Sequence, residues 1–326
     1  MINTTDIFQL HSKATFEDMA YKIFNFQFEN NVVYRSFCDL LYINPSDVCS
    51  LKEIPFLPIQ FFKTHKILSS NQAIEKTFTS SGTTGNTTSK HHITDLKLYE
   101  KSFNQGFKQF YGNIEDYTIL ALLPSYLERD GSSLIYMVDA LIKQSKKPQS
   151  GFYLDNLSAL KDTLTQLDSK GEKVMLIGVS FALLDLIEQH PFQLKNTIVM
   201  ETGGMKGRRK ELVREELHER LKKGFGTKQI HSEYGMTELL SQAYSKGNGV
   251  FECSKTMKVF ARDTEDALTI LDNNKTGGIN IIDLANVNSC AFIATQDLGR
   301  VYKNGNFEII GRFDNSDIRG CNLMAL

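Results

Sequence analysis

Seven consecutive residues, from Thr79 to Gly85, have the composition of a loop that binds phosphate. Five of them carry a hydroxyl group, the other two are glycines, and none has an apolar side chain. Glycine lets the backbone curl so that successive N–H groups face one anion, and Ser and Thr hydroxyls can donate to phosphate oxygens from the same side. An ordinary solvated loop has a similar composition, so the role of this stretch depends on the rest of the chain.

The stretch differs from the nucleotide loop of P-loop kinases. In that loop the second glycine is followed directly by Lys and then by Ser or Thr. Here Asn86 and Thr87 follow Gly85, and the nearest lysine is Lys90. The sequence therefore disfavours a P-loop kinase.

Three later stretches contain residues that suit the other parts of a nucleotide. In Ser232 to Glu238, an aromatic ring that can stack on a base precedes a Thr that can meet a phosphate and a Glu that can bind Mg²⁺. Thr295 to Gly299 contains a carboxylate, which suits the two hydroxyls of a ribose. Gly311 to Gly320 places arginines and acids around a glycine-bounded turn. Each composition alone is that of a common loop, and it is their combination and order that indicate a function.

The overall composition indicates a globular protein with no strong electrostatic preference. The 326 residues, 41% of them hydrophobic and 23% charged, suffice for one large or two ordinary domains. The 37 basic and 38 acidic residues nearly cancel, so no net charge indicates nucleic acid or an anionic membrane as a partner. We find no signal peptide and no run long enough for a membrane span, and we expect a cytoplasmic protein.

The spacing of apolar residues predicts an α/β fold. Short apolar runs alternate with helical patterns, which indicates a mostly parallel sheet covered by helices on both faces. The expected strands are 76–78, 117–123, 173–178 and 196–200, and the expected helices are 15–28, 95–110, 132–144, 157–169, 180–189 and 210–223. After about residue 247 we expect short strands at 268–271, 278–282 and 300–310, the last folded around an Asn304-Gly305 hairpin turn.

In their order along the chain, the four polar stretches resemble the motifs of the adenylate-forming enzymes, which include acyl-CoA synthetases, adenylation domains and firefly-luciferase-like proteins. Those families carry a Ser/Thr/Gly phosphate loop, then Tyr-Gly-x-Thr-Glu, Thr-Gly-Asp and a Gly-Arg-x-Asp hinge. The matching residues here are Thr79 to Gly85, Tyr234 to Glu238, Thr295 to Asp297 with Gln296 in place of glycine, and Gly311 to Asp314, while Gly203-Gly204 resembles the glycine pair that lines the adenine pocket. The resemblance, over residues 77–321, implies that the chain joins ATP and a carboxylic acid into an acyl adenylate and releases pyrophosphate.

Within that superfamily the chain resembles the acyl-protein synthetases of the LuxE type. The similar segments are Leu123 to Arg129 with Ser132 to Leu134, Gly203 to Gly207, and Arg319 to Cys321. That branch activates a fatty acid and passes it to a cysteine near its own C-terminus. The resemblance thus implies a long-chain fatty acid as substrate, and an acyl reductase or another acyl acceptor protein as partner.

Two departures accompany the resemblance. The phosphate loop of the superfamily usually has a lysine three residues after its last glycine, where this chain has Thr88, and Lys90 is the nearest substitute. Most members also continue for ~100 residues past the hinge, of the order of one small domain, with a lysine that serves adenylation. Six residues follow Gly320 here, so we expect this chain to lack that domain and its lysine. We expect residues 1–246 to form N-terminal helices and the α/β core, 247–315 a β-rich part of the same domain, and 316–326 a hinge-like segment and tail.

The resemblance also implies a role for each matching residue. The β- and γ-phosphates of ATP would be held by Ser80, Ser81, Gly82, Thr83, Thr84 and Gly85. The rest of the nucleotide would be held by Gly203, Gly204, Tyr234 and Gly235 at the base, by Asp297 and Arg312 at the ribose, by Thr237 at the α-phosphate and by Glu238 through Mg²⁺. For Asp297 the alternative is a carboxylate that stabilises a turn before Leu298-Gly299.

Other polar residues have less specific interpretations. His231 either touches the acyl carboxylate or is a histidine satisfied at a strand end. His91 and His92 have no recognisable partner, and we expect them to be exposed. The basic cluster from Lys206 to Lys210 is expected at the start of a helix on a solvated face, with CoA or an acidic carrier protein as the alternative ligand.

Cys321 is the predicted acyl acceptor. It follows the hinge motif, and Arg312 and Arg319 would favour its thiolate. An extended linker from Arg312 spans up to roughly 30 Å, enough to return the thiol to the adenylate. The alternative is a spare reduced thiol in a terminal segment. The five cysteines are odd in number and without paired spacing, so we expect no disulfide frame, and we interpret the four others, Cys38, Cys49, Cys253 and Cys290, as structural.

Three hypotheses follow. In the first, the chain activates a fatty or related acid and captures it on Cys321 as a thioester. In the second, CoA or a carrier-protein thiol is the acceptor and Cys321 is idle. In the third, a degenerate adenylating fold binds an acyl ligand or a partner enzyme without catalysis, although a scaffold would not need to retain Thr237, Glu238 and Asp297.

Overall fold

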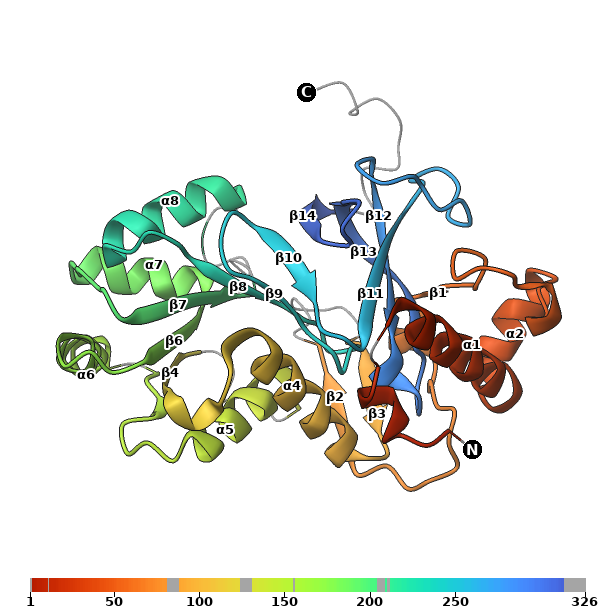
Figure 1. Cartoon of the computed structure of the whole chain (residues 1–326), viewed down its shortest axis with the longest axis horizontal. Helices are drawn as coiled ribbons and strands as arrows, with labels where there is room; N and C mark the ends of the chain where they lie inside the picture. Colours follow the sequence, from red (N-terminus) through yellow and green to blue (C-terminus); the bar gives the residue numbers. More distant parts are fainter. Residues whose placement is uncertain are drawn as a thin grey trace.

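Among the described residues, twelve strands form one mixed sheet (Figure 1). The computed structural model describes residues 2–10, 12–80, 88–123, 131–154, 156–203, 209 and 212–313. The strand order is β11-β12-β13-β14-β10-β9-β8-β7-β6-β4-β5, and β1 pairs with β13 outside this path. A separate two-stranded hairpin is formed by β2 (Lys76–Thr79) and β3 (Lys90–Ile93).

The first part of the sheet is parallel and confirms the predicted α/β fold. Its strands are β4 (Thr118–Leu122), β5 (Gly151–Phe152), β6 (Val174–Val179), β7 (Thr197–Thr202) and β8 (His231–Tyr234). Every residue of β4 and β6 is buried, as expected for apolar strands covered on both faces. In Figure 1, α7 (Ser180–Gln189) and α8 (Arg214–Phe225) lie on one side of these strands, and α4 (Leu96–Tyr111) and α5 (Ser133–Ser145) on the other.

The remaining strands are antiparallel, apart from β1. They are β9 (Ala243–Ser245), β10 (Val250–Cys253), β11 (Met257–Arg262), β12 (Thr276–Asp283), β13 (Phe292–Val301) and β14 (Phe307–Arg312), with β1 (Leu57–Pro58) parallel to β13. The predicted hairpin turn is confirmed between β13 and β14, where Tyr302 N–H donates to Asn306 O over 2.8 Å and Gly305 has φ of 87°. Residues 268–271 form no strand, because Ile270 makes only an isolated bridge to Arg262.

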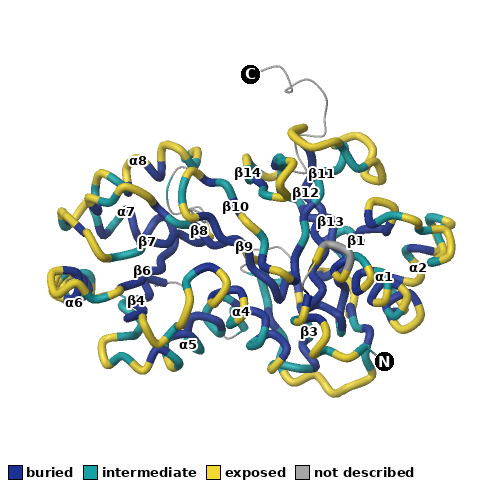
Figure 2. Tube along the Cα trace, in the orientation of Figure 1, coloured by how far each residue is buried: buried dark blue, intermediate teal, exposed yellow. Residues whose placement is uncertain are grey.

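Helices complete the two ends of the sheet. The α1 (Lys13–Asn30) and α2 (Val32–Leu40) pair lies beside the antiparallel strands, and α3 (Phe61–Thr64) and α6 (Leu157–Ser169) are the remaining α-helices of the described residues. Phe24 of α1, Tyr34 of α2 and Phe292 of β13 pack ring against ring, with Tyr34 and Phe292 stacked at 5.9 Å. The buried residues of Figure 2 follow the strands through both parts of the sheet, so one core connects them.

Most predicted helices match the structure closely, and one differs at its start. The helix expected at 210–223 begins at Arg214 and ends at Phe225, where Gly226 adopts a left-handed φ of 68°. Residues 157–169 and 180–189 are helical as predicted. None of the helices in the described ranges is long and apolar enough to cross a membrane.

Candidate active site

Three of the predicted nucleotide-binding residues meet where β8 ends beside β13 and β14. The Tyr234 hydroxyl donates to Asp297 Oδ2 over 2.7 Å, and Arg312 Nε lies 3.3 Å from Asp297 Oδ1. Asp297 and Arg312 are register partners on adjacent strands, which fixes their proximity. The interpretation of Asp297 as a turn residue is wrong, because it lies inside β13.

The Asp297 carboxyl is buried, whereas its partner reaches into solvent. The side chain of Asp297 is 12% exposed and that of Arg312 is 72% exposed. Burial raises the pKa of Asp297, against the opposing effects of the Tyr234 hydrogen bond and of Arg312 and Arg262. The two carboxyl oxygens are thus oriented from different sides, one by the tyrosine and one by the arginine. A carboxyl group that accepts hydrogen bonds from a pair of hydroxyls needs to be oriented in this way.

A second group of predicted residues meets at the base of the phosphate loop. Thr79 and Ser80 lie at the end of β2, and Ser81 to Gly85 lie outside the described residues. Ser80 N–H donates to Ser89 O over 3.1 Å, and Ser89 N–H donates to the Ser80 hydroxyl over 2.9 Å, so the two ends of the loop are joined. The Ser89 side chain also lies close enough to the Glu238 carboxyl to oppose the rise in its pKa. The structure therefore places Glu238 near Ser89, just after the described chain resumes beyond the loop.

The setting of Glu238 fits a Mg²⁺ ion that arrives with a nucleotide. Glu238 is 5% exposed, and burial raises its pKa against the opposing effects of Ser89, Arg312 and Lys63. Within the described ranges, no three His, Cys, Asp or Glu side chains gather as a metal cage would require. Mg²⁺ usually binds to one or two carboxylates together with substrate phosphates, and a single carboxylate beside a phosphate loop meets that requirement.

His91 and Asn286 hold the backbone around Glu238 and were not predicted for the site. His91 is fully buried, so the expectation that it is exposed is wrong. Its Nδ1 lies 2.8 Å from the Thr237 carbonyl oxygen and its Nε2 lies 3.0 Å from Asn286 Oδ1. Asn286 Nδ2 in turn donates to the Glu238 carbonyl over 2.7 Å. The neighbouring His92 is half-buried and contacts the Thr77 hydroxyl at 2.9 Å.

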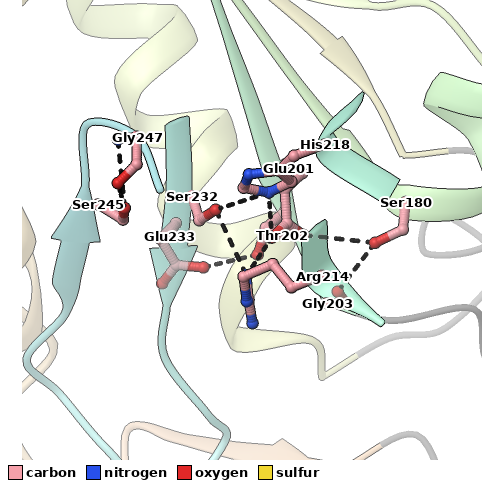
Figure 3. Close-up of polar contacts among 10 residues, drawn as sticks. All are labelled: Ser180, Glu201, Thr202, Gly203, Arg214, His218, Ser232, Glu233, Ser245 and Gly247. Atoms are coloured by element: carbon pink, nitrogen blue, oxygen red, sulfur yellow. Dashed lines mark hydrogen bonds and ion pairs between the residues drawn. The ribbon is translucent and has the colours of Figure 1, made fainter. Parts of the chain in front are cut away.

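A buried polar cluster surrounds Gly203, the first glycine of the predicted adenine-binding pair (Figure 3). Gly203 has a left-handed φ of 68°, and its carbonyl accepts a 3.2 Å hydrogen bond from Ser180. Glu201 accepts hydrogen bonds from Ser180 and Arg214. Burial favours the protonated form of Glu201, but the His218 hydrogen bond and the Arg214 charge outweigh it and lower its pKa. Gly204 lies outside the described residues.

Glu233 is a second buried carboxyl, close to Glu201, and no Lys, Arg or His within the described ranges forms an ion pair with it. It accepts a 2.6 Å hydrogen bond from Thr202, as Figure 3 shows. Burial raises its pKa to about 7, helped by the charge of Glu201. A Cβ atom on Gly235 would lie 2.5 Å from Glu233 Oε1, so a larger residue there would require the carboxyl to shift. No motif singled out Glu233, because its environment comes from residues distant in sequence.

Other sequence predictions have mixed outcomes. His231 Nδ1 lies 3.2 Å from the Tyr111 hydroxyl, and burial lowers its pKa to about 4, which favours a satisfied histidine at a strand end. Of the basic cluster only Arg209 is described, and it pairs with Asp185 and Glu188 of α7.

The predicted acyl acceptor lies beyond the described residues. Asp314, Arg319 and Cys321 belong to the segment after Phe313, which the structure does not describe. Among the other cysteines, Cys38 and Cys290 are buried, Cys253 is half-buried and Cys49 is exposed. Burial raises the pKa of Cys38 and of Cys253 to about 12, so both are poor nucleophiles.

The comparisons with known proteins identify a family and a fold. Residues 10–325 match the family model described as acyl-protein synthetase, LuxE. No curated protein matches the chain. Among solved structures, 2-hydroxyisobutyryl-CoA ligase in complex with its acyl adenylate and CoA covers 93% of this chain and 70% of its own, with a TM-score of 0.70 and 11% identity. ATP-bound MatB from Rhodopseudomonas palustris covers 74% of this chain, with a TM-score of 0.55 and 16% identity. The chain spans about half the length of MatB, since 49% of that chain is covered.

Proposed function

Because the chain belongs to the LuxE acyl-protein synthetase family, we propose that it activates a long-chain fatty acid with ATP and transfers the acyl group to Cys321. The observation that carries the proposal is the contact of Tyr234, Asp297 and Arg312, which brings together residues from three separate motifs. The position of Glu238 beside Ser89 supports it independently.

In the first step, an oxygen of the acid attacks the α-phosphorus of ATP. A bond forms between that oxygen and phosphorus, and the bond to the departing pyrophosphate breaks. Asp297 and Arg312 bind the ribose, while Tyr234 orients the Asp297 carboxyl. Thr237 contacts the α-phosphate, and Gly203, Gly204 and Gly235 line the base. Glu238 would hold Mg²⁺, which would supply neutralising charge on the phosphates.

In the second step, the thiol of Cys321 attacks the acyl carbon of the adenylate. The carbon–sulfur bond forms, the bond from the acyl carbon to the AMP oxygen breaks, and the thiol proton leaves to solvent. The thioester then passes its acyl group to an acceptor such as a reductase. A thiolate attacks far better than a serine hydroxyl, which is not ionised near neutral pH.

The acceptor can be identified by labelling. We expect wild-type protein, incubated with ATP, Mg²⁺ and a labelled fatty acid, to carry label that neutral hydroxylamine releases and that maps to residues 320–326. Cys321→Ser should lose this label but retain isotope exchange between pyrophosphate and ATP. Label on another cysteine, or equal labelling of Cys321→Ser, would contradict acyl transfer to Cys321.

A second acceptor has one specific observation in its favour. The solved complexes of 2-hydroxyisobutyryl-CoA ligase contain both an acyl adenylate and CoA on a similar fold. If CoA is the acceptor here, the labelled acid will appear as a soluble CoA thioester, and Cys321→Ser will form it as fast as wild type.

A further inference from the structure

We propose that His91 and Asn286 are a positioning pair that sets Thr237 and Glu238 in register with the hairpin that carries the phosphate loop. The inference rests on the proposed function, which assigns Glu238 and the loop their roles. His91 belongs to β3, directly after the loop, and Asn286 ends the short 3₁₀ helix η4 (Leu284–Asn286) after β12. The pair thus joins the loop hairpin, the Glu238 segment and the antiparallel part of the sheet.

The contacts reach both consecutive carbonyl groups of the segment. His91 Nδ1 contacts the Thr237 carbonyl at 2.8 Å, and Asn286 Nδ2 contacts the Glu238 carbonyl at 2.7 Å. Ser89 lies directly before β3, two residues from His91, and is close enough to the Glu238 carboxyl to oppose the rise in its pKa. The chain from Ser89 to His91 therefore lies near both the backbone and the carboxyl group of the segment.

Each member of the pair is itself fixed by its surroundings. His91 and Asn286 are 0% and 1% exposed. The Phe62 ring packs edge-on against the His91 ring at 5.6 Å. Gln27 of α1 donates to the carbonyls of Asn286 and Val287 over 3.0 and 2.9 Å. A change in the position of Glu238 would require a change in these packed elements, so its location is determined by rigid parts of the fold.

The polar side-chain atoms of the pair face the Glu238 segment and each other. The backbone carbonyls of Thr237 and Glu238 lie 2.8 Å from His91 Nδ1 and 2.7 Å from Asn286 Nδ2, and His91 Nε2 lies 3.0 Å from Asn286 Oδ1. Loss of either side chain would therefore leave a carbonyl of this segment without its side-chain partner, which is costly in a buried setting.

The test compares nucleotide binding in four full-length variants. The variants are His91→Leu, Asn286→Leu, the double variant, and His91→Asn, which keeps a donor near the position of Nδ1. His92→Asn is the matched control, since His92 is the adjacent histidine on the same strand and contacts Thr77 instead. Isothermal titration with Mg²⁺ and a nonhydrolysable ATP analogue, without acid, measures Kd and the fraction of competent protein. Pyrophosphate exchange measures the Mg²⁺ concentration at half-saturation.

We expect His91→Leu and Asn286→Leu each to raise the Kd and the half-saturating Mg²⁺ by ~10-fold, as for loss of a buried hydrogen bond with an unpaired partner. The double variant should raise the Kd by a smaller factor than the product of the two single factors, because the residues act as one unit. His91→Asn should recover most of the affinity, and His92→Asn should match wild type.

Two results would overturn the proposal, and both differ from the result that would refute the proposed function. A purely structural role would lower the competent fraction or kcat and leave the Kd and half-saturation unchanged in His91→Leu. Additive effects in the double variant would also contradict a joint action. If wild type binds the analogue but exchanges no pyrophosphate with any acid, the proposed function fails while the binding data still decide the role of the pair. Absence of nucleotide binding by wild type would overturn both.

Discussion

Replacement of Asp297 by Asn separates its proposed nucleotide contact from its contribution to the fold. The two side chains have nearly the same shape, so the packing around β13 is retained. The Tyr234 hydroxyl, now 2.7 Å from Oδ2, can still donate to the amide oxygen of Asn. What disappears is the negative charge, which burial already disfavours, as the raised pKa of Asp297 indicates.

The magnitudes can be worked out for stability and for binding. The ion pair with Arg312 is worth at most about 1 kcal/mol, because the arginine side chain is 72% exposed and solvent screens the pair. Relief of a buried charge offsets that loss, so the free energy of unfolding should change by less than about 1 kcal/mol. A hydrogen bond to a charged acceptor exceeds one to a neutral acceptor by about 1 kcal/mol. Two ribose hydroxyls thus lose about 2 kcal/mol, which corresponds to a ~30-fold weaker affinity for ATP.

Two assays on the same preparation test this reasoning. Urea unfolding gives the change in stability, and the ATP dependence of pyrophosphate exchange gives the KM. We expect an unchanged midpoint of unfolding and a ~30-fold higher KM for ATP, and Asp297→Ala should weaken ATP binding further. An unchanged KM together with a marked loss of stability would refute the ribose contact and make Asp297 a structural partner of Tyr234.

Two further predictions concern the other buried carboxyls. Glu238→Ala should abolish Mg²⁺-dependent acid activation and leave the circular dichroism spectrum unchanged, and retained pyrophosphate exchange would exclude Glu238 as the Mg²⁺ ligand. Burial raises the pKa of Glu233 from 4.5 to about 7, so the folded state binds the extra proton and stability falls as pH rises through that window. Glu233→Gln should therefore stabilise the protein by ~3 kcal/mol at about pH 8 and leave it nearly unchanged at about pH 4. Equal pH dependence of urea unfolding in both proteins would contradict this.

The fold was largely predictable because its signals are local. The apolar runs that form β4, β6 and β7 alternate with helices in which apolar residues recur every three or four residues. Both patterns can be recognised within short stretches of sequence. The exception at residues 268–271 has the composition of a strand but pairs with one residue only. Whether such a segment forms a strand depends on a partner strand, which can lie far away in the sequence.

The candidate site residues that belong to a sequence motif could be predicted, whereas those that only tertiary contacts bring to the site could not. Tyr234 and Asp297 belong to motifs, although the 2.7 Å hydrogen bond between them joins residues 63 positions apart. His91 contacts Thr237 from 146 positions away and Asn286 from 195, and neither histidine nor asparagine has a distinctive local pattern there. In the structure, Lys90 to Ile93 form a strand in which His91 is buried and His92 is half-buried on the opposite face, and two consecutive histidines do not show in the sequence which of them faces inward.

The central claim, that this chain activates a carboxylic acid with ATP, is tested most directly by isotope exchange between labelled pyrophosphate and ATP. The measurement uses wild-type protein with Mg²⁺ and a panel of acids that includes short, hydroxylated and long-chain members, with an acid-free sample as the blank. We predict exchange that depends on both Mg²⁺ and acid and is fastest with a long-chain fatty acid. Exchange that no acid increases above the blank would contradict the claim.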